Sequence, residues 1–381
     1  MRHYYDYMNI LICPDKFKDS LTAQQVCEAL EKGIKRRRPK SIIQLMPLAD
    51  GGEGTLEVIK TIHGGEWIKK NVHDPLFRPI DANYLWLADQ KIAYIEMSRA
   101  SGIELLKTKE RNPLLTSTFG TGELILDAID KGAIEIILTI GGSATNDAGI
   151  GMASALGFKF LNKELEELKP IGESLPLIES IITSPLINKI NAIKFKVITD
   201  VQNPLAGKEG AAHVFAKQKG ADVKMIKYLD KGLINIQKLM GKTEKGVIGE
   251  IKGAGAAGGL GAGALYFLQA EIALGAEWLL NKIHFERAVK KADYIITGEG
   301  KIDGQTWGGK LISQVIARCD KQFKQSILVC GVFEDPEKLP IFFDSQEIYS
   351  VRSKAKNAKD SMENAAVYLE KMGEEIALKY L

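Results

Sequence analysis

The stretch Asn9-Ile10-Leu11-Ile12-Cys13-Pro14 is a continuous apolar run with the length of a buried β-strand. A helix is predicted after it, because Thr22 and Gln25 form a capping box ahead of apolar residues at helical spacing. Similar strand-and-loop patterns recur further along the chain, at residues 134–140, 294–297 and 327–330. Strands that do not alternate and that are separated by helices indicate a parallel sheet covered on both faces. We therefore predict an α/β fold with a doubly wound parallel sheet.

Residues 66–104 have a different pattern, with short β-rich segments separated by turn residues such as Asp74-Pro75. This pattern is typical of antiparallel hairpins. We expect a second, mixed α/β domain at residues 73–281, inserted into a discontinuous first domain made of residues 1–72 and 282–381. The sequence leaves open which of the two sheets contains residues 120–157.

The composition narrows the class of protein. The chain has 381 residues and a formal net charge of +3. Its one dense basic run, residues 35–40, ends a predicted helix, where cations complement the helix dipole. We therefore expect no nucleic-acid partner. No apolar run has the roughly 18 residues that a membrane span needs, and residues 1–7 lack the apolar stretch of a signal peptide.

The four cysteines are widely spaced and form no paired motif. We expect them to be reduced thiols in the core, which favours a cytoplasmic protein. The sequence does not decide the oligomeric state, and a homo-oligomer stays open.

Five loops at the ends of predicted strands combine small residues with carboxylates or hydroxyls: residues 15–20, 49–55, 141–147, 200–204 and 298–306. Ligands of doubly wound sheets bind at the carboxyl ends of the strands. The loop at residues 49–55 has three glycines and two carboxylates, which suits an anion near the backbone and a cation near the side chains. One such loop is more often a simple turn. Five together predict a site for phosphate and metal.

The loop at residues 141–147 offers backbone N–H groups and two hydroxyls to a phosphate, with Asp147 as a candidate Mg²⁺ ligand. Residues 304–311 approach the P-loop pattern, but Leu311 stands where that loop needs Ser or Thr. The histidines lack metal-ligand spacing, and no nucleophile elbow is present. Phosphoryl transfer is the chemistry that these observations leave.

At these same loops the chain resembles the bacterial glycerate kinase type 1 family. The matching stretches run in the family's order from Met8 to about Gly331: residues 14–21, 49–55, 111–114, 119–125, 141–147, Asp200 with 203–205, 255–259 and 297–306. The resemblance implies a flavodoxin-like domain with a second domain inserted in it. It implies an ATP- and Mg²⁺-dependent kinase that converts D-glycerate to 2-phosphoglycerate or 3-phosphoglycerate. Ala148 stands where the family often has a glycine, and residues 1–7 resemble an upstream extension.

The resemblance and the residue types together give candidate site residues. Asp50 and Asp200 are alternatives for the general base, and Lys18 is expected to neutralise developing charge. The expected substrate contacts are Asp15, Lys16, Arg99, Arg111 and Thr121. The expected nucleotide contacts are Gly51, Gly52, Glu53, Gly141, Gly142, Ser143, Thr145, Gly298, Glu299 and Gly300. The expected metal ligands are Asp147 and Asp303.

Two other functions stay open at this point. One is a kinase for a related hydroxy or sugar acid. The other is a catalytically silent metabolite sensor on the same scaffold, which would be expected to lack the acidic loop residues. This chain retains Asp15, Asp50, Asp147, Asp200 and Asp303.

Overall fold

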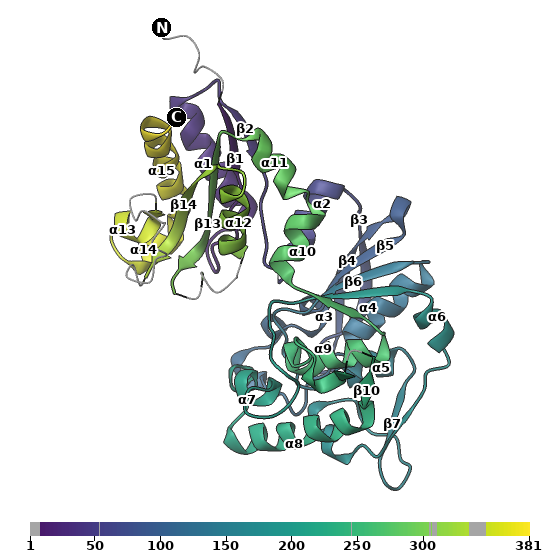
Figure 1. Cartoon of the computed structure of the whole chain (residues 1–381). Helices are drawn as coiled ribbons and strands as arrows, with labels where there is room; N and C mark the ends of the chain where they lie inside the picture. Colours follow the sequence, from purple (N-terminus) through teal and green to yellow (C-terminus); the bar gives the residue numbers. More distant parts are fainter. Residues whose placement is uncertain (1–7, 53, 245, 305, 307–310, 335–347) are drawn as a thin grey trace. The chain divides into compact units, whose positions relative to one another are not determined.

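The structure is a computed structural model that describes residues 8–52, 54–244, 246–304, 306, 311–334 and 348–381 (Figure 1). The chain forms two compact units. The first contains the chain up to Asp50 together with Gly275–Leu381, and the second is Gly51–Leu274. The predicted mixed α/β fold with parallel strands is confirmed.

The first unit is built on a five-stranded sheet in the order β15-β14-β13-β1-β2. All four strand pairings are parallel. Numbered within this unit alone, the order is 2-1-3-4-5, which is the flavodoxin-like order. The strands are β1 (Asn9–Ile12), β2 (Ile42–Leu45), β13 (Tyr294–Ile302), β14 (Gln325–Phe333) and β15 (Ile348–Ser350).

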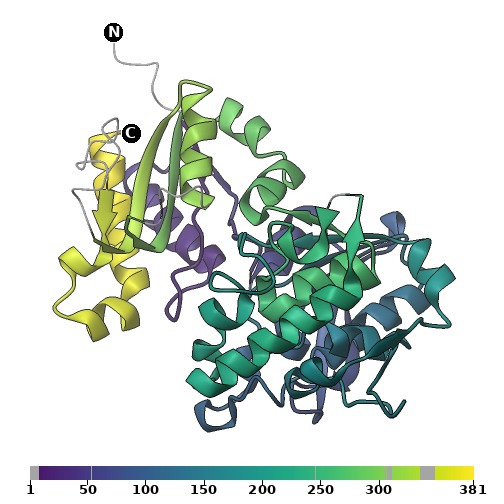
Figure 2. The same cartoon turned by 60° about the horizontal axis from the view of Figure 1, so that its bottom comes forward.

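Helices cover both faces of this sheet (Figure 2). Along β14, Ile327 and Val329 belong to the core shared with α1 and α15, whereas Leu328 and Cys330 pack in a separate cluster with α12. This arrangement is the doubly wound one that the unalternating strands predict. The helices are α1 (Ala23–Arg37), α10 (Gly275–Lys282), α11 (Phe285–Lys291), α12 (Leu311–Asp320), α13 (Val351–Lys354), α14 (Ala358–Glu363) and α15 (Ala365–Lys379).

Helix α1 begins at the predicted capping box, with Thr22 and Gln25 bonded to each other's backbone N–H groups. It packs closely on α15, because a Cβ at Gly33 would lie only 1.9 Å from the carbonyl oxygen of Glu370. Arg36 in the basic run forms ion pairs with Glu370 and Glu374 of α15. The basic run thus contributes to helix–helix packing.

The second unit contains a six-stranded mixed sheet in the order β12-β9-β6-β5-β4-β3. The predicted hairpins are present, because β3, β4 and β5 pair antiparallel, while β5, β6, β9 and β12 pair parallel. The strand within residues 120–157 is β6, so the structure assigns that segment to this sheet. The strands are β3 (Glu66–His73), β4 (Pro79–Leu87), β5 (Ile92–Glu96), β6 (Glu135–Thr139), β9 (Lys194–Ile198) and β12 (Glu271–Ala273).

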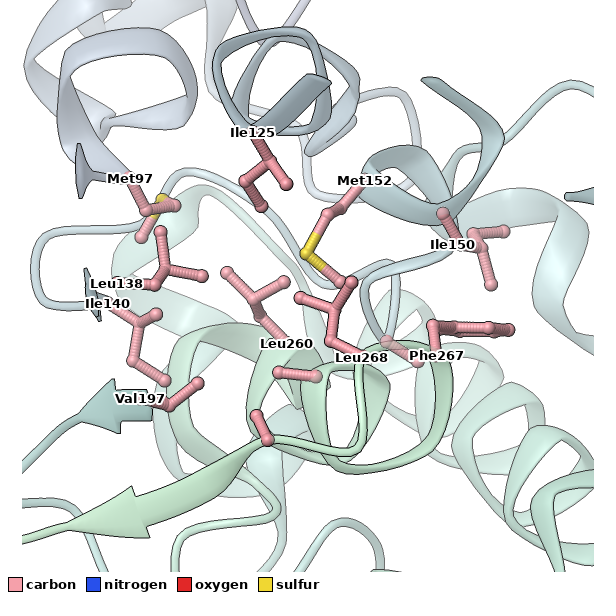
Figure 3. Packing of buried hydrophobic residues seen from close by; sticks show 14 of the residues in the cluster. Met97, Ile125, Leu138, Ile140, Ile150, Met152, Val197, Leu260, Phe267 and Leu268 are labelled. Carbon is pink, nitrogen blue, oxygen red and sulfur yellow. The ribbon is translucent and has the colours of Figure 1, made fainter. Parts of the chain in front are cut away.

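Helices of the second unit pack on this sheet around a large apolar core. Figure 3 shows Leu138 of β6, Val197 of β9, Met152 of α5 and Leu260 of α9 within that core. The helices are α2 (Thr55–His63), α3 (Ser98–Ser101), α4 (Phe119–Asp130), α5 (Ile150–Ala155), α6 (Ile187–Asn191), α7 (Ala211–Phe215), α8 (Val223–Met240) and α9 (Ala256–Phe267).

Short elements complete the second unit. Two small ribbons pair β7 (Lys159–Leu161) with β8 (Ser180–Ile182) and β10 (Lys242–Thr243) with β11 (Gly246–Val247). The 3₁₀ turns are η1 (Ala88–Gln90), η2 (Ile103–Leu105), η3 (Thr108–Glu110), η4 (Gly172–Leu177), η5 (Lys217–Lys219) and η6 (Ile248–Glu250).

The unit boundaries differ from those expected after residues 72 and 281. Strand β3 pairs with β4 along its whole length. Helix α2 is linked to the same sheet, because the Leu56 N–H donates to Oε1 of Glu96 in β5 at 3.2 Å. Both elements therefore belong to the second unit, whereas α10 packs on α11 and α12 of the first.

The cysteines match their expected state. All four are buried, which confirms their predicted position in the core, and none forms a disulfide bond: Cys13, Cys27, Cys319 and Cys330. None of the helices in the described part of the chain is both long enough and apolar enough to cross a membrane.

Candidate active site

Three carboxylates gather at the carboxyl ends of adjacent strands in the first unit. Asp15 follows β1, Asp50 follows β2, and Glu299 lies near the end of β13. Burial of Asp15 and the charges of Asp50 and Glu299 raise the pKa of Asp15 from 3.8 to about 8. The part of this shift that comes from Asp50 and Glu299 reflects neighbouring negative charge at this edge of the sheet. Such a cluster suits a bound cation.

The backbone around Asp15 is held in place by hydrogen bonds. The Asp15 N–H donates to the carbonyl oxygen of Gly298 at 2.7 Å. The Lys16 N–H donates to Asp15 Oδ1 at 2.6 Å, which favours the charged carboxylate. The side chain of Lys18 is exposed. Lys16 and Lys18 lie in the same loop as Asp15, between β1 and α1.

Residues 298–302, expected to be loop, continue strand β13, and all of them except Gly300 pair with β14 in the register. A Cβ at Gly298 would lie 1.7 Å from the Val329 carbonyl oxygen. A Cβ at Gly300 would lie 3.1 Å from the backbone nitrogen of Lys18. Glycine is thus required at Gly298, and Gly300 also lies close to another backbone; the expected role of both as nucleotide contacts stays a prediction.

Asp303 lies just after β13. Its carboxylate is 3.4 Å from Lys301 Nζ, and its backbone N–H donates to Thr306 Oγ1 at 3.1 Å. Among the residues that the structure describes, no group of three or more His, Cys, Asp or Glu side chains is arranged to hold a metal ion by itself. A metal at this edge would therefore need ligand atoms from substrates and water as well.

Two glycine-containing loops meet in the second unit. Gly51 has φ 88° and Gly142 has φ 76°, a left-handed conformation that favours glycine. A Cβ at Gly141 would lie 3.0 Å from the Cα of Gly52, so the two loops are in close contact. Glu53 lies outside the described residues. The expected anion-binding backbone is therefore drawn from both loops.

Lys219, which is not among the residues predicted from the sequence, forms hydrogen bonds to the loop at residues 141–147. Lys219 Nζ donates to Ser143 Oγ and to the Thr145 carbonyl oxygen, both at 2.6 Å. Burial lowers the pKa of Lys219 to about 7, although the charge of Asp147 opposes this shift. Lys219 lies in the polar segment Lys217-Gln218-Lys219, which has the composition of a surface turn. No sequence signal distinguishes it.

Asp147 is fully buried, and its oxygens already accept several hydrogen bonds. The donors to Oδ2 are the N–H and hydroxyl of Thr118 at 2.7 and 2.8 Å, with the Gly151 N–H at 3.2 Å. The Gly149 N–H donates to Oδ1 at 3.2 Å. Asp147 thus fixes the start of α5. These contacts do not support its expected role as a metal ligand.

Arg99 is also engaged within the protein. Its Nε lies 2.7 Å from Glu96, and its Nη1 donates to Asn83 at 2.5 Å. The remaining terminal nitrogen pairs with Glu57, and the guanidinium lies 4.7 Å from the centre of the Trp67 ring. All parts of the guanidinium have partners. Arg99 is therefore better explained as a structural link than as a substrate contact.

The other expected site residues of the second unit have different surroundings. Thr121 is buried, and its hydroxyl shares a 2.7 Å hydrogen bond with that of Ser101. Asp200 follows β9 and is exposed. Arg111 is half-buried, and its Nε has no hydrogen-bond partner among the described residues. Arg111 and Asp200 stay candidates for substrate contact, whereas Thr121 contributes to packing.

Comparison with known proteins places this arrangement in context. The sequence matches the model of the glycerate kinase family over residues 10–381. It is 45% identical to a glycerate kinase of Halalkalibacterium halodurans, over 82% of each chain. It is 39% identical to a glycerate kinase of Bacillus subtilis, over 97% of each chain. It is 40% identical to a glycerate 2-kinase of Escherichia coli, over 86% of each chain.

A solved structure is similar throughout its length. The crystal structure of a chain assigned as glycerate kinase 2 from Salmonella typhimurium superposes with a TM-score of 0.84. The two sequences are 36% identical, and the match covers 98% of each chain.

Proposed function

Because this chain belongs to the glycerate kinase family and is a kinase that acts on glycerate, we propose that it transfers the γ-phosphoryl group of ATP to the 2-hydroxyl of D-glycerate. The observation that supports the chemistry is the carboxylate cluster at the strand ends of the first unit, where burial and then the charges of Asp50 and Glu299 raise the pKa of Asp15. The position of attack is supported by the 40% identity to a glycerate 2-kinase.

We propose that this cluster holds Mg²⁺ together with the nucleotide. A cation would relieve the repulsion of Asp15 by Asp50 and Glu299, so the residues present fit the ion. Mg²⁺ is usually bound by one or two carboxylates, with substrate phosphates and water supplying its other ligands. The absence of a complete acidic cage among the described residues is consistent with this mode. When bound, the ion would neutralise charge on the phosphates.

Two carboxylates are candidates for the general base. Asp50 and Asp200 are exposed at the ends of β2 and β9, so each is accessible to a substrate hydroxyl. A carboxylate in this role would accept the proton of the glycerate hydroxyl as that oxygen attacks phosphorus. Lys18, exposed on the loop after β1, would offset the charge that develops on the transferred group.

The anionic groups of the substrates need donors. The Gly52 and Gly141 loops allow close backbone approach to a phosphate, because glycine leaves the backbone uncovered. Arg111 is the candidate cation for the glycerate carboxylate, since its Nε has no hydrogen-bond partner among the described residues. We also propose that the protein acts in the cytoplasm, where its four free thiols would stay reduced.

Phosphorus NMR tests the function directly. The protein is incubated with ATP, Mg²⁺ and D-glycerate, and the resonances of 2-phosphoglycerate and 3-phosphoglycerate are resolved. We expect 2-phosphoglycerate and ADP, and no phosphoglycerate when EDTA replaces Mg²⁺. Accumulation of 3-phosphoglycerate alone would contradict the proposed position of attack. Tartronate and erythronate serve as competing acceptors, and a higher kcat/KM for either one would contradict glycerate as the preferred substrate.

Two variants then rank the candidate bases. Asp50→Asn and Asp200→Asn are compared at saturating substrates, where loss of the base is expected to lower kcat at least about a hundredfold. If each variant stayed within about threefold of the wild type, a difference of only about 0.65 kcal/mol, neither residue would be the base.

A further inference from the structure

Lys219 is a buried basic residue that the proposed reaction does not yet use. It ends the turn η5 and is only 2% exposed. The next residue, Gly220, has φ 96°, and a Cβ there would lie 2.1 Å from the Arg111 carbonyl oxygen. The chain can therefore make this close turn only with glycine after Lys219.

The ammonium group of Lys219 contacts one short segment of the glycine-rich loop. Its Nζ lies 2.6 Å from both Ser143 Oγ and the Thr145 carbonyl oxygen. Further polar atoms in this segment are buried without a hydrogen-bond partner among the described residues, namely Thr145 Oγ1 and the side-chain nitrogen and oxygen of Asn146. Buried polar groups are nearly always satisfied, so a segment with several exceptions has room for a bound ion, ligand oxygen or water.

The charge balance at this place favours an anion. Among the described residues, no carboxylate lies within ion-pair distance of Lys219. The nearest influence is Asp147, whose charge acts on Lys219 without contact because its own oxygens accept hydrogen bonds from Thr118 and two glycines. Burying an ammonium without a paired carboxylate is costly. A bound oxyanion on the loop would supply the missing negative charge.

We propose that Lys219 is a positioning residue that holds Ser143 and Thr145 in the form that binds an oxyanion of the substrates. The inference rests on the proposed function and deepens it. The oxyanion is either a phosphoryl group of the nucleotide or the carboxylate of glycerate, which present the same chemistry to the loop. Lys219 acts through the loop and does not take part in bond making.

The test compares Lys219→Met with Lys217→Met, because Lys217 lies in the same turn and is exposed. Methionine keeps an unbranched side chain and removes the charge. Lys219→Met is expected to raise KM for one anionic substrate about tenfold, which equals about 1.4 kcal/mol, with kcat within about threefold. Lys217→Met should leave both KM values unchanged. A raised KM for ATP assigns a phosphoryl group to the loop, and a raised KM for glycerate assigns the carboxylate.

Other results would overturn the inference. If Lys219→Met changes Tm but leaves both KM values within about twofold of wild type, the residue is only structural. Should this variant fail to fold, Ser143→Ala decides, because it removes one of the two acceptors. Ser143→Ala is then expected to raise the same KM about threefold, and an unchanged KM would overturn the inference.

Failure of the proposed function is distinguishable from failure of this inference. A wild-type protein that makes no phosphoglycerate contradicts the function. The rise in Tm caused by ADP or by glycerate then still tests Lys219, since it needs no turnover. A smaller rise in Lys219→Met than in Lys217→Met supports the inference, and equal rises overturn it.

Discussion

The guanidinium group of Arg99 lies 4.7 Å from the centre of the Trp67 ring. The same group pairs with Glu96, which is only 2% exposed, and with Glu57 on helix α2. Glu96 in turn accepts the N–H of Leu56 at the start of α2. These contacts join helices α2 and α3 with strands β3 and β5. They explain why α2 belongs to the second unit.

Replacing Arg99 with alanine should therefore destabilise the second unit. The free energy of unfolding is expected to fall by about 2–4 kcal/mol, because Glu96 would be left buried without its cationic partner. The kcat/KM for glycerate in the folded fraction should stay within about threefold. Urea denaturation and steady-state kinetics measure the two quantities.

The control for Arg99 is an exposed ion pair. Lys159 and Glu167 are each 56% exposed, so Lys159→Ala should cost less than about 1 kcal/mol. An Arg99→Ala variant with normal stability and a tenfold higher KM for glycerate would show that Arg99 binds substrate, as the sequence analysis expected.

Asp15→Asn should make the protein more stable at high pH and less active. The pKa of Asp15 is raised in the folded chain, from 3.8 to about 8, so the folded state binds this proton more tightly than the unfolded state. Ionisation of Asp15 therefore reduces stability progressively as pH rises from about 4 to about 8. Asparagine removes that penalty, which we expect to be on the order of 1–2 kcal/mol after allowance for the partial exposure of the side chain.

Thermal unfolding of wild type and Asp15→Asn at pH 5 and pH 8 checks the sign. The difference in stability between Asp15→Asn and the wild type should be larger at pH 8 than at pH 5, in favour of the variant. The kcat/KM of the variant should fall at least about tenfold. The matched control is Asp19→Asn in the same loop, because Asp19 is exposed and has φ 60°, which asparagine also adopts. Equal stability changes in the two variants would argue against repulsion within the carboxylate cluster.

Much of the fold could be predicted because its signals are local. The capping box of Thr22 and Gln25 marks the start of α1, and the apolar run before it is strand β1. The unit boundary could not be predicted, since it depends on contacts between residues distant in sequence, such as Arg99 and Glu57, which lie 42 residues apart. No local pattern records such a pairing.

The candidate site was predicted in part for the same reason. Strand ends and glycine loops are visible in the sequence, so Asp15 and the Gly141 loop could be proposed as site residues. Lys219 was missed because burial, not residue type, distinguishes it from other lysines. Gly298 was assigned to a ligand loop, but its lack of a side chain serves the packing of β13 on Val329.

The four cysteines should react slowly with a thiol reagent in the native protein. Burial raises the pKa of Cys319 and Cys330 to about 12, so the reactive thiolate is rare at pH 8. The pKa values of Cys13 and Cys27 are also raised by burial. Ellman's reagent should titrate less than about one thiol per chain within minutes in buffer, and all four in guanidinium. Rapid labelling of the native protein would contradict the buried positions of these side chains.

Gly258→Ala should disturb the packing of α9 on the loop that carries Thr145. Gly258 has φ 69°, and a Cβ there would lie 2.1 Å from the Thr145 carbonyl oxygen, so backbone must move to admit it. We expect a loss of about 2–4 kcal/mol in stability, as is usual when strain and overpacking combine.

Gly207→Ala is the matched control, because Gly207 has φ 89° but no atom within 4 Å of the added Cβ. That variant pays only the left-handed backbone strain, about 1–2 kcal/mol. Denaturation curves of the two variants separate backbone strain from overpacking. Equal losses of stability in both would mean that the loop moves to admit the added methyl group without cost.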